Sequence, residues 1–407
     1  MRTGPRLGVL PFSLLGTEQG EAYLAQSLAE EITAGLSRFR GLSLVSTSSI
    51  AQAVHDGRDD AVLRQGLGLD YLVDGTVQRV LQRLRITVRL VDLRDGNQVV
   101  WTRRFDRLMD DLLTLQDEVA AETVAQIDPE VLQAESRRAA LVPVQDAGPY
   151  EFALRALPGM LRADRAQFME AGEWLRRSME RQPDNAVAEA SYAYWLHFLI
   201  EHGWAEDLEA TAEAASHHAE RAISLDSQNA RAFAIAGHVR AALQRRIPEA
   251  LSLHERALAL NPNLGMAWAL SGFAHLYAGD AAQAQRRFDH YKQLSPADPF
   301  AFQLDAGRSL VALLNRDFEQ AANLGRAVSE LNPDFAAASI PYLSALGHLG
   351  RGPEAAVIRR RLLAHAGGFS LRRFAETSPF SRPEDSELIA AGLRLAGVPE
   401  SEPAQAK

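Results

Sequence analysis

Short apolar runs alternate with helical stripes in the first third of the chain. Residues 6–12 (RLGVLPF) predict a buried strand, and residues 42–45 predict a second, shorter one. Between them, large apolar residues recur every three or four positions, which predicts a helix with one buried face. That stripe consists of Leu24, Leu28, Ile32, Leu36 and Phe39. Ser48 and Ser49 are suited to cap a further helix that runs through His55.

Three consecutive strands are predicted next. Apolar and polar side chains alternate over residues 71–78, 83–90 and 99–106, the pattern of a sheet with one buried face. The Asp95-Gly96 pair is suited to the hairpin turn before the last strand. The apolar positions that follow predict the start of a long helix. They are Leu108, Leu112, Leu115 and Val119.

These patterns divide the chain into four segments. Residues 1–142 are expected to form an α+β domain with a mixed, largely antiparallel sheet and helices. Residues 143–149, with two prolines and a glycine, predict a linker. Residues 150–370 show helical patterns throughout, and residues 371–407 predict a helical cap followed by a disordered tail.

A repeated motif indicates the architecture of the helical segment. Leu-Asn-Pro or Leu-Ser-Pro ends at Pro262, Pro296 and Pro333, so the motif recurs after 34 and then 37 residues. The best-formed unit has Gly272 and Ala284 where two antiparallel helices approach closely, and a proline that ends the second helix. Three consecutive units with prolines in phase predict an all-α superhelical solenoid of tetratricopeptide repeats (TPR), about five or six in number.

Five stretches of the first segment resemble a known domain. They are RLGVLPF, YLAQSLAEEITAGLSRFRGLSLVS, LGLDYLVDGTVQR, LRITVRLVDLRDGNQVVWTRRFD and LLTLQDEVAAETVA. Together they resemble the TolB-like amino-terminal domain of bacterial adenylate/guanylate cyclase-associated and winged-helix regulator-associated TPR proteins. The array (ALNPNLGMAWALSGFAHLYAGD) and the tail (FAETSPFSRPEDSELIAAGLRLAGVPE) fit the same architecture, and the resemblance covers about residues 6–400.

The resemblance implies a regulatory module of bacterial signal transduction. In those families a cyclase domain or a winged-helix DNA-binding domain commonly precedes the TolB-like domain. Five residues cannot hold either, so we expect the sensory and scaffolding half without an output domain. The implied partner is then a cyclase, kinase or transcription regulator encoded separately. A truncated remnant of a longer regulator is the alternative.

Composition excludes several classes of chemistry. A formal net charge of −9 argues against sequence-independent binding of nucleic acid, which needs a basic surface. The absence of cysteine excludes disulfides, thiol catalysis and cysteine-ligated metals. The most apolar run, residues 192–200, is far shorter than the ~20 residues that span a bilayer. No signal peptide is recognisable, so we expect a cytoplasmic protein without a membrane partner.

Catalytic motifs are missing from the sequence. It contains no P-loop, no GxSxG elbow and no HExxH pair. Gly66-Leu67-Gly68 lacks the third glycine of a dinucleotide-binding loop and follows no predicted strand. His217 and His218 are adjacent on a predicted helix, where they point about 100° apart and cannot share one ion. We therefore expect a non-enzymatic protein with no cofactor and no metal site.

One basic stripe is a candidate site for an anion. Arg83, Arg85 and Arg89 lie on one face of the predicted strand 83–90. Three acidic residues on neighbouring strands are suited to pair with them across the sheet: Asp74, Asp92 and Asp106. A solvated, cross-paired face is the favoured interpretation. The alternative is a small-molecule receptor that binds an anionic ligand here and self-associates through its TPR array.

The concave side of the array is the predicted partner-binding groove. The first helix of each repeat lines that side. The predicted lining residues are Tyr194, His197, Phe198, Arg231, His238, Met266, Phe273, Leu276, Tyr277, Phe300 and Gln303. Because this groove is apolar and aromatic with sparse charge, we expect it to bind a helix or an extended apolar segment of a protein partner. The alternative occupants are the chain's own N-terminal domain or a second copy in a homodimer.

Overall fold

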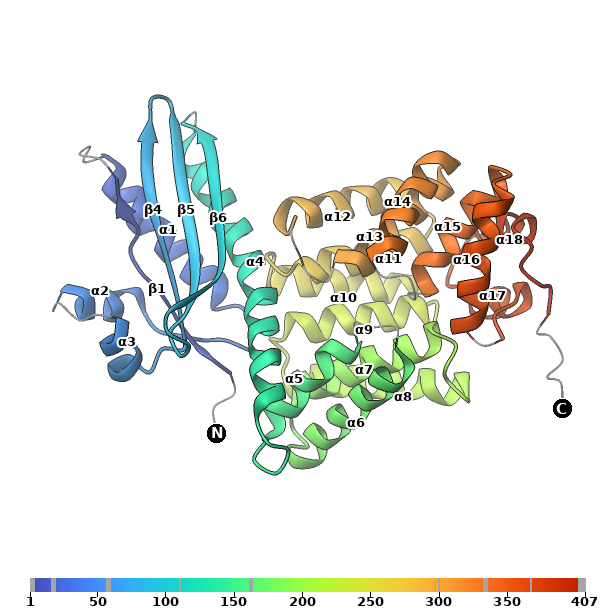
Figure 1. Ribbon diagram of the computed structural model, residues 1–407, viewed down its shortest axis with the longest axis horizontal. Coiled ribbons are helices and arrows are strands. Elements are labelled where there is room, and N and C mark those ends of the chain that lie inside the picture. The colour runs from blue at the N-terminus through green and yellow to red at the C-terminus, as the bar shows by residue number, and fades with distance from the viewer. Residues whose placement is uncertain are drawn as a thin grey trace. The chain divides into compact units, whose positions relative to one another are not determined.

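The computed structural model describes residues 4–15, 20–55, 60–109, 111–160, 164–296, 298, 301–331, 336–366 and 368–401. The chain divides into two compact units, one of residues 1–135 with 293–297 and one of residues 136–292 with 298–407 (Figure 1). The boundary after residue 135 lies inside a long helix. The predicted linker, residues 143–149, is mostly a non-helical turn that ends in the first residue of the next helix.

A six-stranded mixed sheet forms the centre of the first unit. The strand order is β3-β1-β4-β5-β6, and β2 pairs with β4 beyond the end of β1. The pairs β1–β3, β1–β4 and β2–β4 are parallel, whereas β4–β5 and β5–β6 are antiparallel. The strands are β1 (Arg6–Val9), β2 (Ser13–Leu14), β3 (Ser43–Leu44), β4 (Tyr71–Val80), β5 (Arg83–Asp92) and β6 (Gln98–Leu108).

Helices cover both faces of this sheet. The helices of the first unit are α1 (Gly20–Leu36), α2 (Thr47–His55), α3 (Asp60–Leu67) and the first part of α4 (Leu112–Leu141). The predicted apolar stripe is buried throughout, although its last member, Phe39, lies beyond the end of α1. Ser27 Oγ donates to Gln116 Oε1 of α4 at 2.8 Å. A second cluster joins Ile50 of α2 and Leu63 of α3 to Leu72 of the sheet. The alternation predicted for residues 83–90 is confirmed, because its four apolar side chains are fully buried.

The first strand is shorter than the predicted range 6–12. β1 ends at Val9, and Pro11 has no N–H to donate to a neighbouring strand. The N–H of Leu10 still donates to the carbonyl of Val73 at 2.8 Å. Pairing resumes in β2, which lies beside a later part of β4.

Two predicted helix starts are wrong. α2 is capped by Ser46, whose Oγ accepts the N–H of Ser49 at 3.2 Å, so Ser48 and Ser49 lie within the first turn. α4 begins after Asp111, whose carboxylate accepts two backbone N–H groups of the first turn. Leu108 is therefore the last residue of β6 and not part of the helix.

The last strand departs from strict alternation. Gly96 and Asn97 both have positive φ, 61° and 60°, so they form the centre of the hairpin turn rather than Asp95 and Gly96. A β-bulge then shifts the register between β5 and β6. Val99 and Trp101 consequently point to opposite faces, and Val99 is 47% exposed, contrary to its predicted burial.

The second unit is a helical array of the tetratricopeptide type. Successive helices pack as pairs, such as α5 with α6, α7 with α8 and α9 with α10 (Figure 1). Its described helices are α5 (Pro149–Met160), α6 (Arg165–Arg181), α7 (Ala186–Glu201), α8 (Leu208–Leu225), α9 (Ala230–Ala242), α10 (Ile247–Leu260), α11 (Gly265–Tyr277), α12 (Ala281–Leu294), α13 (Ala301–Leu314), α14 (Phe318–Leu331), α15 (Ala336–His348), α16 (Gly352–His365), α17 (Leu371–Thr377) and α18 (Pro383–Leu395).

Glycine allows the paired helices to approach, as predicted for Gly272. A Cβ at Gly272 would lie 2.9 Å from the ring of Phe288, and Phe288 and Ala284 are fully buried. The same relationship holds one repeat earlier between Gly237 and His254, also at 2.9 Å. Pro333, which marks the next repeat in the sequence, lies outside the described residues.

Candidate functional site

A cavity of about 190 Å³ lies against the inner helices of the array. Helices α7, α9, α11, α13 and α15 contribute one wall. The other wall comes mainly from residues 368–389, called here the C-terminal segment, which contain α17. Seven aromatic side chains line the cavity: Tyr194, Phe198, Phe273, Tyr277, Phe369, Phe374 and Phe380. A concave, mostly apolar site with a few polar groups is typical of a ligand-binding pocket.

The structure brings together part of the predicted groove. Six of the predicted residues line the cavity: Tyr194, His197, Phe198, His238, Phe273 and Tyr277. Arg231 and Met266 are not among its lining residues and contact each other, with 3.7 Å between Nη1 and Sδ. Leu276 is fully buried in the core between helix pairs and does not line the cavity. Phe300 and the side chain of Gln303 lie outside the described residues.

The C-terminal segment is held to the inner helices by backbone and aromatic contacts. The N–H of Ser381 donates to the carbonyl of Tyr277 at 2.8 Å. The ring of Phe380 meets the ring of Tyr277 edge-on, with 5.5 Å between centroids. Arg245 donates from Nη2 to the carbonyl of Glu376 at 2.8 Å. The concave face therefore already holds a segment of this same chain, an occupant that neither alternative from the sequence named.

Polar groups gather at one side of the cavity. His197 and Glu201 belong to α7, and their closest atoms, Nε2 and Oε2, are 3.7 Å apart. His197 Nε2 also lies 3.1 Å from Nε2 of His238 on α9, so one ring donates and the other accepts. Glu201 and Arg373 are the charged residues that line the cavity within the described chain.

Burial sets the protonation of these groups. It lowers the pKa of His238 to about 3 and holds the pKa of His197 well below its usual range, so both rings are neutral at pH 7. It raises the pKa of Glu201 to about 7. About 30% of the Glu201 side-chain surface is open, and because Glu201 lines the cavity we attribute that opening to the cavity itself. An acid in an apolar enclosure without a cationic neighbour favours its neutral form.

The basic stripe on the sheet is paired. Arg89 and Asp74 face each other in the β4–β5 ladder and form two hydrogen bonds, at 2.8 and 2.6 Å. Arg85 lies opposite Asp106 of β6 and bonds it at 2.8 Å. Arg83 is exposed at the start of β5. These cross-strand ion pairs correspond to the favoured interpretation of the stripe as a solvated face.

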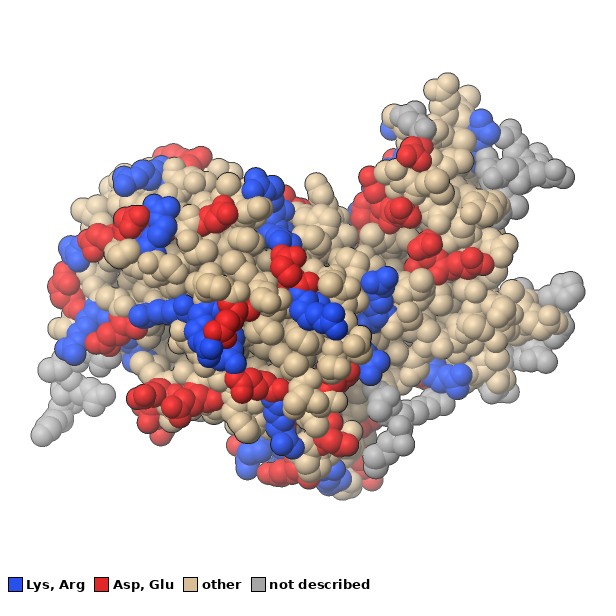
Figure 2. Space-filling model, turned by 180° about the vertical axis from the view of Figure 1, so that it is seen from behind, with Lys and Arg blue, Asp and Glu red and all other residues tan. Residues whose placement is uncertain are grey.

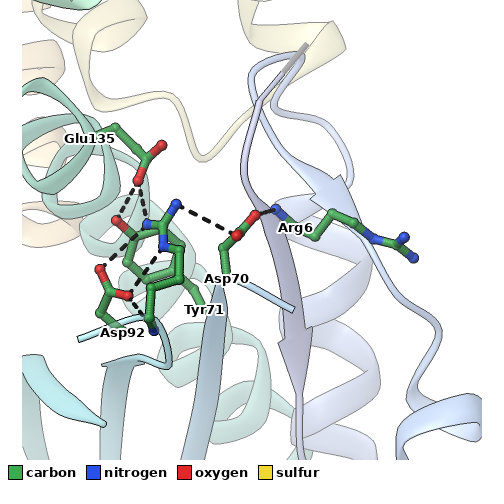
Figure 3. A network of polar contacts seen from close by, with 6 residues as sticks. Arg6, Asp70, Tyr71, Asp92 and Glu135 are labelled. Carbon is green, nitrogen blue, oxygen red and sulfur yellow. Dashed lines mark hydrogen bonds and ion pairs between the residues drawn. The ribbon is translucent and has the colours of Figure 1, made fainter. Parts of the chain in front are cut away.

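Asp92 does not pair with the stripe but belongs to a buried network around Arg94 (Figure 3). Arg94 forms an ion pair with Asp92 at 3.3 Å, with Asp70 at 3.6 Å, and with Glu135 of α4. Its guanidinium stacks on the ring of Tyr71, whose hydroxyl donates to Glu135 at 2.7 Å. Burial and the Glu135 carboxylate raise the pKa of Tyr71 above its usual value. The network fixes the start of β4, the end of β5 and α4 to one another.

Sequence reasoning missed both Glu201 and the C-terminal segment. Glu201 ends α7 one helical turn after His197, on the same face, so its spacing was a usable signal. The segment contains Ser-Pro-Phe-Ser-Arg-Pro at residues 378–383, in which two prolines flank an aromatic residue. That pattern indicates a non-helical apolar stretch but not where it docks.

Basic and acidic side chains are interspersed on the face shown in Figure 2. Ion pairs also join neighbouring parts of the array, such as Arg351 with Glu319 at 2.7 Å. Across the described residues, every helix is too short or too polar to traverse a lipid bilayer.

Comparison with curated proteins finds a relative by sequence. No family model matches the chain. The chain is 28% identical over 187 residues to a protein of Rhizobium meliloti (strain 1021) named putative adenylate cyclase 3. The match covers 46% of this chain and 32% of the relative, so the chain matches about a third of that protein's length.

Several solved structures show distant likeness. YrrB, a TPR protein with an unusual peptide-binding site, is 18% identical over 47% of this chain and 91% of its own, with a TM-score of 0.29. PilF of Pseudomonas aeruginosa is 18% identical over 57% and 92%, with a TM-score of 0.35. TolB of Acinetobacter baumannii is 15% identical over 31% and 28%, with a TM-score of 0.24. At these scores the likeness assigns neither a fold nor a function by itself.

Proposed function

We propose that this chain is a non-catalytic interaction scaffold of bacterial signal transduction that binds a protein partner through the concave face of its helical array. One observation carries the proposal: the concave face holds a polypeptide segment, residues 378–382, by a backbone hydrogen bond and an aromatic contact. Main-chain hydrogen bonds and aromatic pockets are the means by which grooves bind extended peptides. A partner segment of similar chemistry would displace the C-terminal segment and take its place.

The signalling context rests on resemblance. The first unit combines a mixed sheet with helices on both faces, an arrangement compatible with the TolB-like domain that its sequence resembles. The sequence relative carries the name of an adenylate cyclase, which supports a cyclase or another signalling regulator as the partner class. Cytoplasmic action belongs to the same proposal, whereas self-association through the array belongs to the alternative, a small-molecule receptor.

A peptide-displacement experiment tests the groove. The probe is a labelled peptide of residues 377–383, TSPFSRP. The protein is the full chain with Phe380→Ala, a substitution that weakens the binding of the chain's own C-terminal segment to the groove. We expect saturable binding to this variant and at least fivefold weaker binding to the wild type, because an attached segment competes at a high effective concentration. Adding Tyr277→Ala to the variant removes the ring that Phe380 contacts and should abolish binding.

The partner itself is sought by affinity purification from the native host. A true partner should be recovered in larger amounts with the Phe380→Ala protein than with the wild type. It should not be recovered with the double variant Phe273→Ala/Tyr277→Ala. Tyr23→Ala is the matched control, since this tyrosine is 73% exposed and lies in the other unit. The proposal fails if the peptide binds no variant and the recovered proteins are the same for all of them.

A further inference from the structure

We propose that the cavity between the inner helices and the C-terminal segment binds a small amphipathic cation, an amine with an apolar body, through the carboxylate of Glu201 and the surrounding aromatic rings. The site needs the resident segment in place, because Phe374 and Phe380 form part of its wall. It does not depend on the existence of a protein partner.

The charge of the cavity favours a cation. Within the described part of the chain, His197 is the one group at ion-pair distance from Glu201, and its ring is neutral at pH 7. His238 is neutral for the same reason. A carboxylate in an apolar enclosure without a compensating charge is costly. A bound ammonium group supplies that charge and forms a charge-assisted hydrogen bond.

Aromatic faces provide the second half of the recognition. Phe273 and Tyr277 lie 6.2 Å apart between ring centroids, and Tyr277 and Phe380 lie 5.5 Å apart. On α7, Tyr194 lines the same cavity as Glu201. Ammonium groups bind over such rings by cation–π attraction, and sets of rings around one site are the usual means of holding amines.

The volume limits the size of the ligand. A cavity of about 190 Å³ holds on the order of ten water molecules. That space suits an arylalkylamine of about ten non-hydrogen atoms rather than a nucleotide. A metal ion fits poorly, because within the described residues no group of three or more histidine or acidic side chains converges on one point.

Arg373 is the competing feature of the site. It lies on α17 and lines the cavity near Gly203. Its Nη2 is 3.7 Å from the position that a Cβ on Gly203 would occupy. A carboxylate ligand would use Arg373 and would be repelled by Glu201. Within the described residues, the group at ion-pair distance from Glu201 is His197 and not Arg373. The two ligand classes are therefore separable by experiment.

The test uses three probes of matched shape on the full-length chain: phenethylamine, 2-phenylethanol and 3-phenylpropionate. Binding is measured by isothermal titration calorimetry at pH 8, where Glu201 is mostly ionised. We expect phenethylamine to bind at least tenfold more tightly than the alcohol, and 3-phenylpropionate to bind most weakly. Glu201→Gln should reduce the affinity for the amine at least tenfold, whereas the exposed control Glu206→Gln should leave it unchanged.

Other results overturn the inference. Equal binding of amine and alcohol would show an apolar pocket without charge recognition, and tighter binding of the carboxylate would assign the site to Arg373. Absence of binding by all three at millimolar concentration would also refute it. The double variant Glu201→Gln/Phe380→Ala should still bind the peptide of residues 377–383. Failure of the amine site would therefore leave the proposed partner-binding function standing.

Discussion

His254 packs against Gly237 just as Phe288 packs against Gly272 one repeat later. In both pairs a Cβ on the glycine would lie 2.9 Å from the facing ring. The histidine is fully buried, and within the described chain neither of its ring nitrogens has a hydrogen-bond partner. A polar ring thus occupies a slot that the following repeat fills with a hydrocarbon, at a cost in stability.

His254→Phe is therefore expected to raise the free energy of unfolding by about 1–3 kcal/mol at pH 7, the cost of burying unpaired polar atoms. Burial lowers the pKa of His254 to about 3, against about 6.5 in the unfolded chain. The unfolded state alone takes up this proton as the pH falls from 6.5 towards 3, so stability falls in that window. Urea unfolding from pH 7 to pH 4 should show a shallower fall for the variant; an unchanged slope would contradict the argument.

Glu201→Gln should raise the melting temperature by about a few degrees at pH 8 and very little at pH 5. The pKa of Glu201 is raised to about 7, so the folded protein retains a proton that the unfolded chain has lost between pH 4.5 and pH 7. Stability of the wild type consequently falls as the pH rises through that window. The amide removes this dependence.

The groups that face Glu201 titrate outside the window. His197 and His238 stay neutral, and burial raises the pKa of Tyr194 and Tyr277. Differential scanning calorimetry at pH 5 and pH 8 checks the result, with Glu206→Gln as control. A gain of equal size at both pH values would show that ionisation of Glu201 is not the cause.

Arg94→Met should destabilise the first unit by about 3–5 kcal/mol, because it leaves Asp70, Asp92 and Glu135 buried without their common cation. Arg89→Met is the matched control. Its ion pair with Asp74 is exposed, and its loss should cost no more than about 1 kcal/mol. Chemical denaturation followed by hydrogen exchange in β4 and β5 measures both effects. Equal losses would show that burial does not distinguish the two arginines.

Gly347→Ala should loosen the contact between α15 and α18. A Cβ at this position would lie 1.9 Å from the carbonyl oxygen of Gly392, a backbone atom that cannot rotate away. We expect the free energy of unfolding to fall by about 1–3 kcal/mol and proteolysis after α17 to become faster. Gly352→Ala, with no atom within 4 Å of its Cβ, is the control and should be nearly neutral. Equal protease resistance of the two variants would refute the close approach.

Local pattern predicted the elements and the inward face of the array. The alternation over residues 83–90 specified which face of β5 is buried, because a strand has a fixed two-residue period. The repeat placed Gly272 against Phe288 for the same kind of reason, since both positions recur in phase along the helices. It also placed Tyr194, Phe273 and Tyr277 on the cavity wall.

Local pattern failed where one residue changes the geometry. The bulge lies between Val99 and Trp101, and its extra residue inverts the side chains on one side of it relative to those on the other. Val99 therefore points away from the face of Trp101 although the sequence alternates. Pro11 shortened the first strand by removing a donor. Leu276 lies in the core between helices and not on the concave face, which depends on how neighbouring pairs are rotated.

The candidate site was decided by tertiary structure. Its inner wall comes from helices that the repeat defines, but its outer wall comes from Phe374 and Phe380, more than a hundred residues further along the chain than Tyr194 and Phe273. The periodicity of apolar residues predicts which side of a helix or strand is buried. It does not predict which distant segment of the chain covers that side. The docking of the C-terminal segment, and with it the enclosure that raises the pKa of Glu201, follows only from the shape and hydrogen bonds of the assembled array.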